Sequence, residues 1–213
     1  MRVELRNINR TFGSVQANRD VSLSVDGGRI HGLLGENGAG KTTLMKVLAG
    51  YLAPDSGTIL LDGQPVHFRS PADALAHGIG MLHQDPLDVP AMSVLENFML
   101  GRRQGFWIPR REARRELETL GQRFAFRFDP DVSVGSLTVG ERQQLELLRL
   151  LSLGARVIVL DEPTTGISAP QKILMFRALR QLVAEGMSAI FVSNKLEEIA
   201  DLCSEVTVLR NGQ

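Results

Sequence analysis

The 213 residues are enough to bury one hydrophobic core, and their 43% hydrophobic content is typical of a globular protein. The 24 basic and 24 acidic residues cancel, which excludes a strong overall field for nucleic acid, so we predict no nucleic-acid partner. The one cysteine, Cys203, excludes an intrachain disulfide framework and predicts a buried structural thiol. With no apolar leader and no run of about 18 apolar residues, we expect a cytoplasmic chain.

Glycine, proline and asparagine divide the first 85 residues into short units with strand or helix periodicity. Ser70 as N-cap, Pro71 at the first helical position and Asp73 in a capping-box-like pair mark one helix start. The predicted units are strands at 21–25 and 29–35, a helix at 41–50, a hairpin about Asp62-Gly63 and a helix ending at Gly78.

From about 86 to 153 the pattern is mainly helical and amphipathic. Ser93 and Glu96 mark one helix start there. Eight arginines between 102 and 127 predict a solvated face, with a contact to membrane partners or a nucleic-acid patch as the alternatives.

The C-terminal third again alternates strands and helices. Strands are predicted within 156–163, 188–194 and 205–209, and a short helix at 195–203. Between the first two strands, one helix is expected to bury a face made of Ile173, Leu174, Phe176, Leu179, Leu182 and Val183.

Residues 35–42, GENGAGKT, match the pattern Gly-x-x-x-x-Gly-Lys-Ser/Thr between an apolar strand and a helix. Such a loop points successive N–H groups at phosphate oxygens, and a plain strand-to-helix turn is the weaker alternative. We expect Lys41 to contact the β- and γ-phosphates and Thr42 to bind Mg²⁺. The candidate nucleotide-binding residues here are Gly35, Glu36, Asn37, Gly38, Ala39, Gly40, Lys41, Thr42 and Thr43.

Asp161 and Glu162 follow an apolar strand, which places both carboxylates at the carboxyl edge of the predicted sheet. Asp161 is then a candidate Mg²⁺ ligand through water, and Glu162 a candidate catalytic base for an attacking water. Two ordinary solvated carboxylates are the alternative. We therefore predict an α/β fold: a P-loop nucleoside triphosphatase core with a mainly parallel sheet, an N-terminal antiparallel β portion and an inserted helical subdomain. The core is 1–85 with 154–213, and the subdomain is 86–153.

The pair Asn194-Lys195, with Glu197 two positions on, is close to the Asn-Lys-x-Asp element with which GTPases hold guanine. GTPases also carry Asp-x-x-Gly, but Thr164 stands where that glycine would follow Asp161. Glu197 also stands where an aspartate would pair with guanine. These departures disfavour guanine recognition.

A short polar turn at 136–140 opens a long leucine-rich helix, so the free N–H groups of that helix face outward. Here the sequence resembles the ATP-binding cassette (ABC) ATPases, the motors of ABC transporters, whose signature Leu-Ser-Gly-Gly-Gln is approximated by residues 137–141, LTVGE. Thr138, Val139 and Glu141 depart from that signature. The resemblance spans nearly the whole chain and is nearest to importers of simple sugars and nucleosides, in which two cassettes are often fused.

The resemblance implies ATP with Mg²⁺ and a head-to-tail pair of cassettes, either a homodimer or a fused tandem. Thr138 and Gly140 would then serve the partner's γ-phosphate. It also implies that Gln84 is a catalytic and metal-contacting loop glutamine and that Phe12 stacks on adenine. Further partners would be transmembrane permease subunits, which would hold the chain on the inner face of the membrane.

The resemblance also places Asn194 where the family has a histidine that contacts the γ-phosphate. An amide donates a hydrogen bond but cannot become cationic, so we expect turnover slowed about 10²- to 10³-fold. Asn194 is also expected to cap the following helix. Three functions stay open: a transport motor, a cassette that binds ATP as a switch with little hydrolysis, and a soluble relative acting on the ribosome or damaged DNA. No basic run is interleaved with aromatic residues, which disfavours the third.

Overall fold

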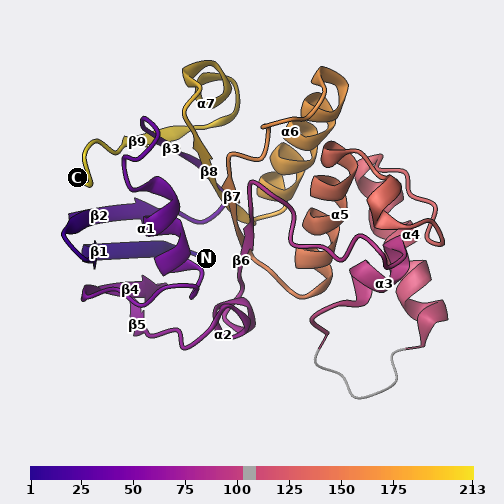
Figure 1. The fold of residues 1–213 in the computed structure, drawn as a ribbon, viewed down its shortest axis with the longest axis horizontal. Helices are drawn as coiled ribbons and strands as arrows, with labels where there is room; N and C mark the ends of the chain where they lie inside the picture. The colour runs from indigo at the N-terminus through magenta and orange to yellow at the C-terminus, as the bar shows by residue number, and fades with distance from the viewer. Residues whose placement is uncertain (103–108) are drawn as a thin grey trace.

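The computed structural model describes residues 1–102 and 109–213, which form two sheets with helices between and around them (Figure 1). The antiparallel sheet has the order β2-β1-β4-β5, and the parallel sheet the order β6-β7-β8-β3-β9. The predicted α/β class, with its antiparallel portion, is confirmed. The strands are β1 (Val3–Phe12), β2 (Val15–Val25), β3 (Ile30–Leu34), β4 (Ser56–Leu61), β5 (Gln64–Val66), β6 (Ile79–Leu82), β7 (Val157–Asp161), β8 (Ser188–Ser193) and β9 (Glu205–Val208).

The helices lie on both faces of the parallel sheet, and α3, α4 and α5 gather at the end of the molecule away from the antiparallel sheet (Figure 1). No helix in the described part of the chain is both long and apolar enough to cross a bilayer. The helices are α1 (Lys41–Leu48), α2 (Pro71–Ala76), α3 (Val94–Met99), α4 (Arg110–Phe124), α5 (Val139–Ser152), α6 (Ala169–Ala184) and α7 (Leu196–Leu202), with a 3₁₀ turn at Val134–Ser136.

Two apolar cores explain this arrangement. The first lies between the two sheets, where Leu44 and Met45 of α1 are buried against alternate residues of the strands. The second lies on the other face of the parallel sheet, where α5 and α6 cover Phe191. Burying one leucine or phenylalanine side chain contributes about 1.5–3 kcal/mol, so continuously apolar strands such as β7 favour a doubly covered position.

The predicted helix-start signals are mostly confirmed. Ser93 and Glu96 form a capping box at α3, and the Ser70 side chain accepts the Asp73 N–H at α2. Asp73 differs in one respect, because its carboxylate accepts the N–H of Arg69 and not that of Ser70. The four-residue strand β6, which the sequence pattern did not single out, forms one edge of the parallel sheet.

The sequence prediction for the buried face of α6 is partly wrong. Ile173 is 59% exposed, whereas Met175 and Ala178 are 1% exposed. Phe176, Leu179 and Leu182 are buried as predicted, and Met175 and Ala178 complete the buried face. Ile173 lies outside that face, since apolar character alone does not decide which side of a helix meets the sheet.

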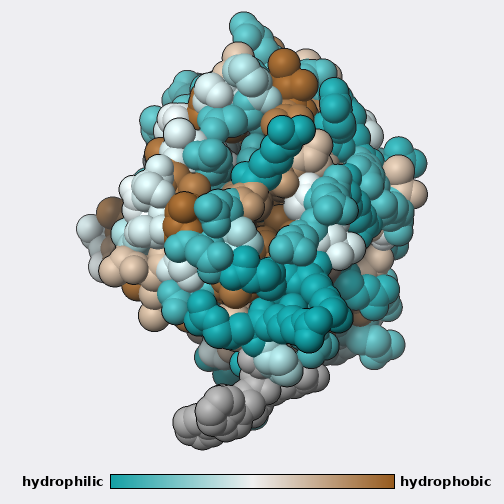
Figure 2. Space-filling view, turned by 90° about the vertical axis from the view of Figure 1, so that its right-hand side faces the viewer, coloured by the Kyte–Doolittle hydropathy of each residue, from teal (hydrophilic) through white to brown (hydrophobic). Residues whose placement is uncertain are grey.

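The arginines of α4 and its flanks are mainly paired on a hydrophilic surface. Figure 2, which looks onto the side of the molecule that carries these helices, shows that surface as largely polar. The three pairs of Arg110, Arg114 and Arg123 are exposed, contribute little to stability and agree with the predicted solvated face, whereas the Arg102 side chain is only 14% exposed. One member of the run, Arg103, lies outside the described residues. The ion pairs are Arg102–Glu116, Arg110–Glu96, Arg114–Asp131 and Arg123–Glu185.

Cys203 ends α7 and is only partly buried, packed toward β3. A Cβ atom on Gly32 would lie 3.1 Å from its sulfur. Burial raises the pKa of the thiol to about 12, so Cys203 stays protonated and unreactive at neutral pH. The predicted burial is therefore only partly right, while the raised pKa agrees with a structural thiol.

Candidate functional site

Most of the predicted site residues gather at the carboxyl ends of four neighbouring parallel strands, whereas Phe12, Thr138 and Gly140 lie elsewhere. The strand order β6-β7-β8-β3 brings together the segments that follow each of these strands. Gln84 follows β6, Asp161 ends β7, Asn194 follows β8, and the glycine loop follows β3. Ligands of open α/β sheets bind at this edge.

The glycine loop needs its glycines for two different reasons. A Cβ atom on Gly40, which has φ 98°, would lie 2.2 Å from the carbonyl oxygen of Ala17. A Cβ on Gly35 would lie 2.4 Å from the carbonyl oxygen of Leu209. Gly38 has φ 83° but meets no atom within 4 Å, so that side of the loop is open to a ligand.

Lys41 lies inside the curl of the loop with only 5% of its surface exposed. Its Nζ atom donates to the carbonyl oxygens of Gly35 (2.8 Å) and Glu36 (3.0 Å) and lies 3.9 Å from Glu162 Oε1. A buried ammonium group needs such partners. The cation is thus held beside the open face of the loop, where an anion would meet it.

Asp161 and Thr42 form the polar link between β7 and α1. Thr42 Oγ1 donates to Asp161 Oδ1 at 3.1 Å, and Asp161 is 4% exposed. Burial raises the pKa of Asp161, the Thr42 hydrogen bond lowers it, and the nearby Glu162 raises it further. The pair offers a hydroxyl and one carboxylate to whatever lies beside the loop.

Glu162 has an unusual backbone for a non-glycine residue, with φ 47°. This left-handed conformation costs about 1–2 kcal/mol and is held here by a hydrogen bond from Glu162 N to the Val192 carbonyl (3.0 Å). The chain turn that results directs the carboxylate into a cavity of about 570 Å³. This cavity is lined by Val15, Gln16, Ala17, Asn37, Gly38, Ala39, Gly40, Lys41, Thr42, Thr43, Gln84, Glu162, Asn211 and Gly212.

Asn194 lies just beyond this cavity, in an adjoining hollow lined also by Gly35 and Glu36. Its Nδ2 atom donates to Asn37 Oδ1 at 3.2 Å, so the side chain reaches the glycine loop. The predicted helix cap is wrong: Lys195 is the N-cap of α7, and its N–H is accepted by Ser193 Oγ at 3.0 Å. Asn194 stands one position too early to cap and faces the loop instead.

Phe12 lies at the tip of the β1–β2 hairpin, 44% exposed. The guanidinium carbon of Arg10 lies 4.8 Å from the centre of its ring. Phe12 itself is not among the residues that line the cavity, whereas Val15, opposite it in the hairpin, is. One face of the ring is thus taken by Arg10 at the rim of the site.

Thr138 and Gly140 stand at the start of α5 and do not line the cavity beside the glycine loop. Thr138 Oγ1 donates to Glu141 Oε2 (2.7 Å), and Thr138 N donates to the same oxygen (2.8 Å), which closes a capping box. Gln171 of α6 also donates to Thr138 Oγ1 at 2.8 Å. A Cβ on Gly140 would lie 2.4 Å from Gln171 Oε1, so a larger residue there would displace that amide from Thr138.

The sequence reasoning missed Glu198, which joins the segment after β7 to the last residue of β8. Its Oε2 atom accepts the hydroxyls of Thr164 (2.6 Å) and Ser193 (3.2 Å), and it is 4% exposed. Lys195 and Lys172 lie 3.3 Å and 3.7 Å from Oε1. No sequence pattern pairs Thr164 with a residue 34 positions away.

These residues fit a nucleoside triphosphate. The loop supplies N–H groups at the N-terminus of α1, an open face at Gly38 and the cation of Lys41. No cluster of three or more His, Cys, Asp or Glu side chains is present in the described ranges, so a protein-only metal cage is absent from them. Thr42 and Asp161 could hold Mg²⁺ together with phosphate oxygens and water, the ligand set that this ion prefers.

Residues 18–165 match the family model described as ABC transporter. The chain belongs to the ABC transporter family. This ABC cassette is 41% identical over 209 residues to the arabinose import ATP-binding protein AraG 1 of Burkholderia ambifaria and 42% identical over 218 residues to the ribose import ATP-binding protein RbsA of Chromobacterium violaceum. The alignments cover 97% and 100% of this chain but 42% and 43% of those relatives, so the chain spans less than half of their length.

Solved structures give the same family. A nucleotide-free ATP-binding cassette from an ABC transporter superposes with a TM-score of 0.88 at 25% identity, covering 100% of this ABC cassette and 89% of that chain. The ADP conformation of MJ1267, an ATP-binding cassette of an ABC transporter, gives 0.87 at 26% identity, covering 100% and 89%. The resemblance stated from the sequence motifs is confirmed.

Proposed function

We propose that this chain is the ATP-binding and ATP-hydrolysing motor cassette of an importer for a sugar or a nucleoside. The observation that carries the proposal is the joint placement of Lys41, Thr42, Asp161 and Glu162 beside one open cavity at the sheet edge. The printed names of the relatives, arabinose and ribose import ATP-binding proteins, support a pentose as the solute.

Within this proposal the glycine loop binds the phosphates and Lys41 neutralises them. Thr42, Asp161 and Gln84 would hold Mg²⁺, which would supply charge stabilisation at the phosphates. Glu162, directed into the cavity by its left-handed backbone, accepts the proton of an attacking water. Gln84 lines the same cavity, and Asn194 approaches the loop from the adjoining hollow.

Two cassettes in head-to-tail contact complete the proposed site. Thr138 and Gly140 lie outside the cavity of their own chain, so a second cassette would supply the equivalent residues. Residues 1–85 with 154–213 form the nucleotide-binding core, and 86–153 form the helical subdomain that meets the permease subunits. Those partners would hold the cassette at the inner face of the membrane.

The test measures nucleotide binding and turnover separately. Binding of a fluorescent ATP analogue is expected for the wild-type chain, and Lys41→Met should weaken it by about 100-fold, since a charge-assisted contact to phosphate is lost. Uptake of labelled arabinose or ribose by cells with and without the full-length protein tests the solute. Equal nucleotide binding by wild type and Lys41→Met would refute the assigned site.

A further inference from the structure

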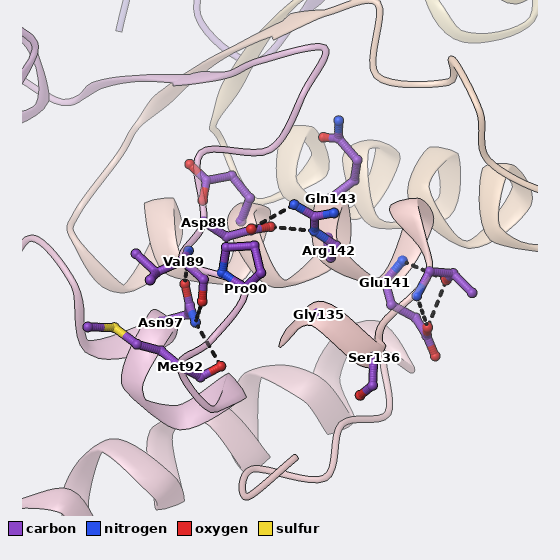
Figure 3. A network of polar contacts seen from close by, with 12 residues as sticks. Asp88, Val89, Pro90, Met92, Asn97, Gly135, Ser136, Glu141, Arg142 and Gln143 are labelled. Carbon is purple, nitrogen blue, oxygen red and sulfur yellow. Dashed lines mark hydrogen bonds and ion pairs between the residues drawn. The ribbon is translucent and has the colours of Figure 1, made fainter. Parts of the chain in front are cut away.

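The loop that joins β6 to α3, residues 83–93, is attached to α5 and α3 by buried polar side chains (Figure 3). Gln84, which lines the cavity, stands at the start of this loop. The attachments fall into two groups, one for the far half of the loop and one for the segment that carries Gln84.

The far half is held by Asp88 and Asn97. Both carboxylate oxygens of Asp88, whose side chain is 7% exposed, accept from the guanidinium of Arg142 on α5, at 2.6 and 2.7 Å. Asn97 of α3 accepts the N–H of Val89 (2.8 Å) and donates to its carbonyl (3.1 Å). Figure 3 shows the side chains of Arg142 and Asn97 directed at the loop. These contacts hold the far half of the loop without using Gln143.

The near half is held by the Gln143 side chain of α5, beside an edge-to-face contact between the rings of His83 and Tyr51 (centroids 4.7 Å apart). Gln143 is fully buried, and its Nε2 atom donates to the backbone carbonyls of His83 (2.9 Å) and Gln84 (2.8 Å). Because both partners are acceptors, only the NH₂ end of the amide can face them. The contact joins residues 59 and 60 positions apart.

The other end of the Gln143 amide is left without a partner. Its Oε1 atom is buried and accepts no hydrogen bond within the described residues. A buried acceptor without a donor is unfavourable, and methionine would fill the same space without that penalty. Packing of α5 therefore does not explain the glutamine, whereas the two carbonyls that it holds do.

We propose that Gln143 is a positioning residue that fixes the backbone of Gln84 against the signature end of α5. The inference rests on the proposed function, which assigns Gln84 to the nucleotide site. Gln143 lies three residues, about one helical turn, after Gly140. A nucleotide that draws Gln84 toward the glycine loop therefore pulls on the helix turn next to Thr138 and Gly140, and nucleotide binding is transmitted to that helix end.

The experiment compares wild type with Gln143→Met and with a matched control, Gln144→Met. Gln144 is buried on the same helix, 4% exposed, and within the described residues no hydrogen bond joins its side chain to the loop. Amide hydrogen exchange is followed in peptides covering 82–88 and 138–142, with and without ATP in EDTA, where no hydrolysis occurs. The thermal midpoint of each protein is measured in parallel.

We expect exchange at 82–88 to be about tenfold faster in nucleotide-free Gln143→Met than in wild type, because local opening becomes easier. ATP should slow exchange at 138–142 in wild type and in Gln144→Met, and leave it unchanged in Gln143→Met. A role in packing alone would lower the thermal midpoint without removing this response to ATP. Should Gln143→Met not fold, Gln143→Asn keeps an amide but is one methylene too short to reach both carbonyls, and the same result is expected.

Equal exchange at 82–88 in wild type and Gln143→Met would overturn the inference. So would a response to ATP at 138–142 that is absent in wild type or preserved in Gln143→Met. Failure of wild type to bind ATP at all would instead overturn the proposed function, and with it this inference, whereas loss of the response in Gln143→Met alone leaves the proposed function standing.

Discussion

Glu141→Gln should strengthen ATP-dependent association of two cassettes. The Glu141 carboxylate lies at the start of α5, where we propose that a second chain's nucleotide binds. Its Oε2 atom accepts both Thr138 N (2.8 Å) and Thr138 Oγ1 (2.7 Å), two donors that a phosphate would otherwise use. Glutamine keeps the size of the side chain and removes its negative charge, so an incoming phosphate no longer meets a like charge.

The size of the effect follows from the charge and its surroundings. Two unit charges about 4 Å apart near a protein surface interact by about 4 kcal/mol before salt screens them. Glu141 is partly exposed, so about 1–2 kcal/mol of repulsion should remain, equivalent to an association about 5- to 30-fold tighter. The same change weakens the capping box, and the free energy of unfolding should fall by about 0.3–1 kcal/mol.

Sedimentation velocity with ATP in EDTA measures this association without hydrolysis. The matched control is Glu118→Gln, which removes the same charge from an exposed position on α4 and should leave association unchanged. The gain in Glu141→Gln should shrink at about 0.5 M salt, because screening removes part of the repulsion. Association that is equal to or weaker than wild type in Glu141→Gln would refute the reasoning.

Three further outcomes are expected. Asn194→His should raise ATP turnover about 10²- to 10³-fold in a steady-state assay, because a cationic donor stabilises the developing phosphate charge better than a neutral amide; a rise below about threefold would contradict this. Asp161→Asn should raise the thermal midpoint of the nucleotide-free protein at pH 8. Burial raises the pKa of Asp161, so the ionised carboxylate destabilises the fold above that pKa. The gain in thermal midpoint should vanish below pH 3.8, the ordinary pKa of an aspartate, where the carboxyl is protonated in both the folded and the unfolded chain. A constant advantage at every pH would exclude this cause. Arg142→Met should lower the free energy of unfolding by about 3 kcal/mol in denaturant titrations, because it leaves the buried Asp88 carboxylate unpaired. Adding Asp88→Asn to the same chain should restore part of that stability. If the double variant is no more stable than Arg142→Met, the ion pair is not the cause.

Local chemistry explains why much of the fold could be read from the sequence. Continuously apolar runs such as β7 and β8 predict strands covered on both faces, and the glycine loop carries its own backbone requirements at Gly35 and Gly40. Parallel strands then bring Asp161 and Thr42 together without any further information. The predicted nucleotide loop and the carboxylates beside it follow from these short-range patterns.

Contacts between distant segments could not be read in that way. Gln143 and Gln84, whose carbonyl it holds, are 59 residues apart, and neither residue type predicts a contact with the other. Ile173 was assigned to a buried face by its apolar character, but the neighbours of α6 decide which side is covered. Asn194 was expected to cap a helix because asparagine often does, whereas its position one residue too early turns it toward Asn37.

Glu198 links the segment that carries Glu162 to the segment that carries Asn194. One carboxylate accepts the hydroxyls of Thr164 and Ser193, so a substitution that shifts either segment should also shift the other. A substitution of Glu162 should therefore change the effect of a substitution of Asn194, and the reverse. Substitutions at these two places should show epistasis, with Glu198 as the shared hub.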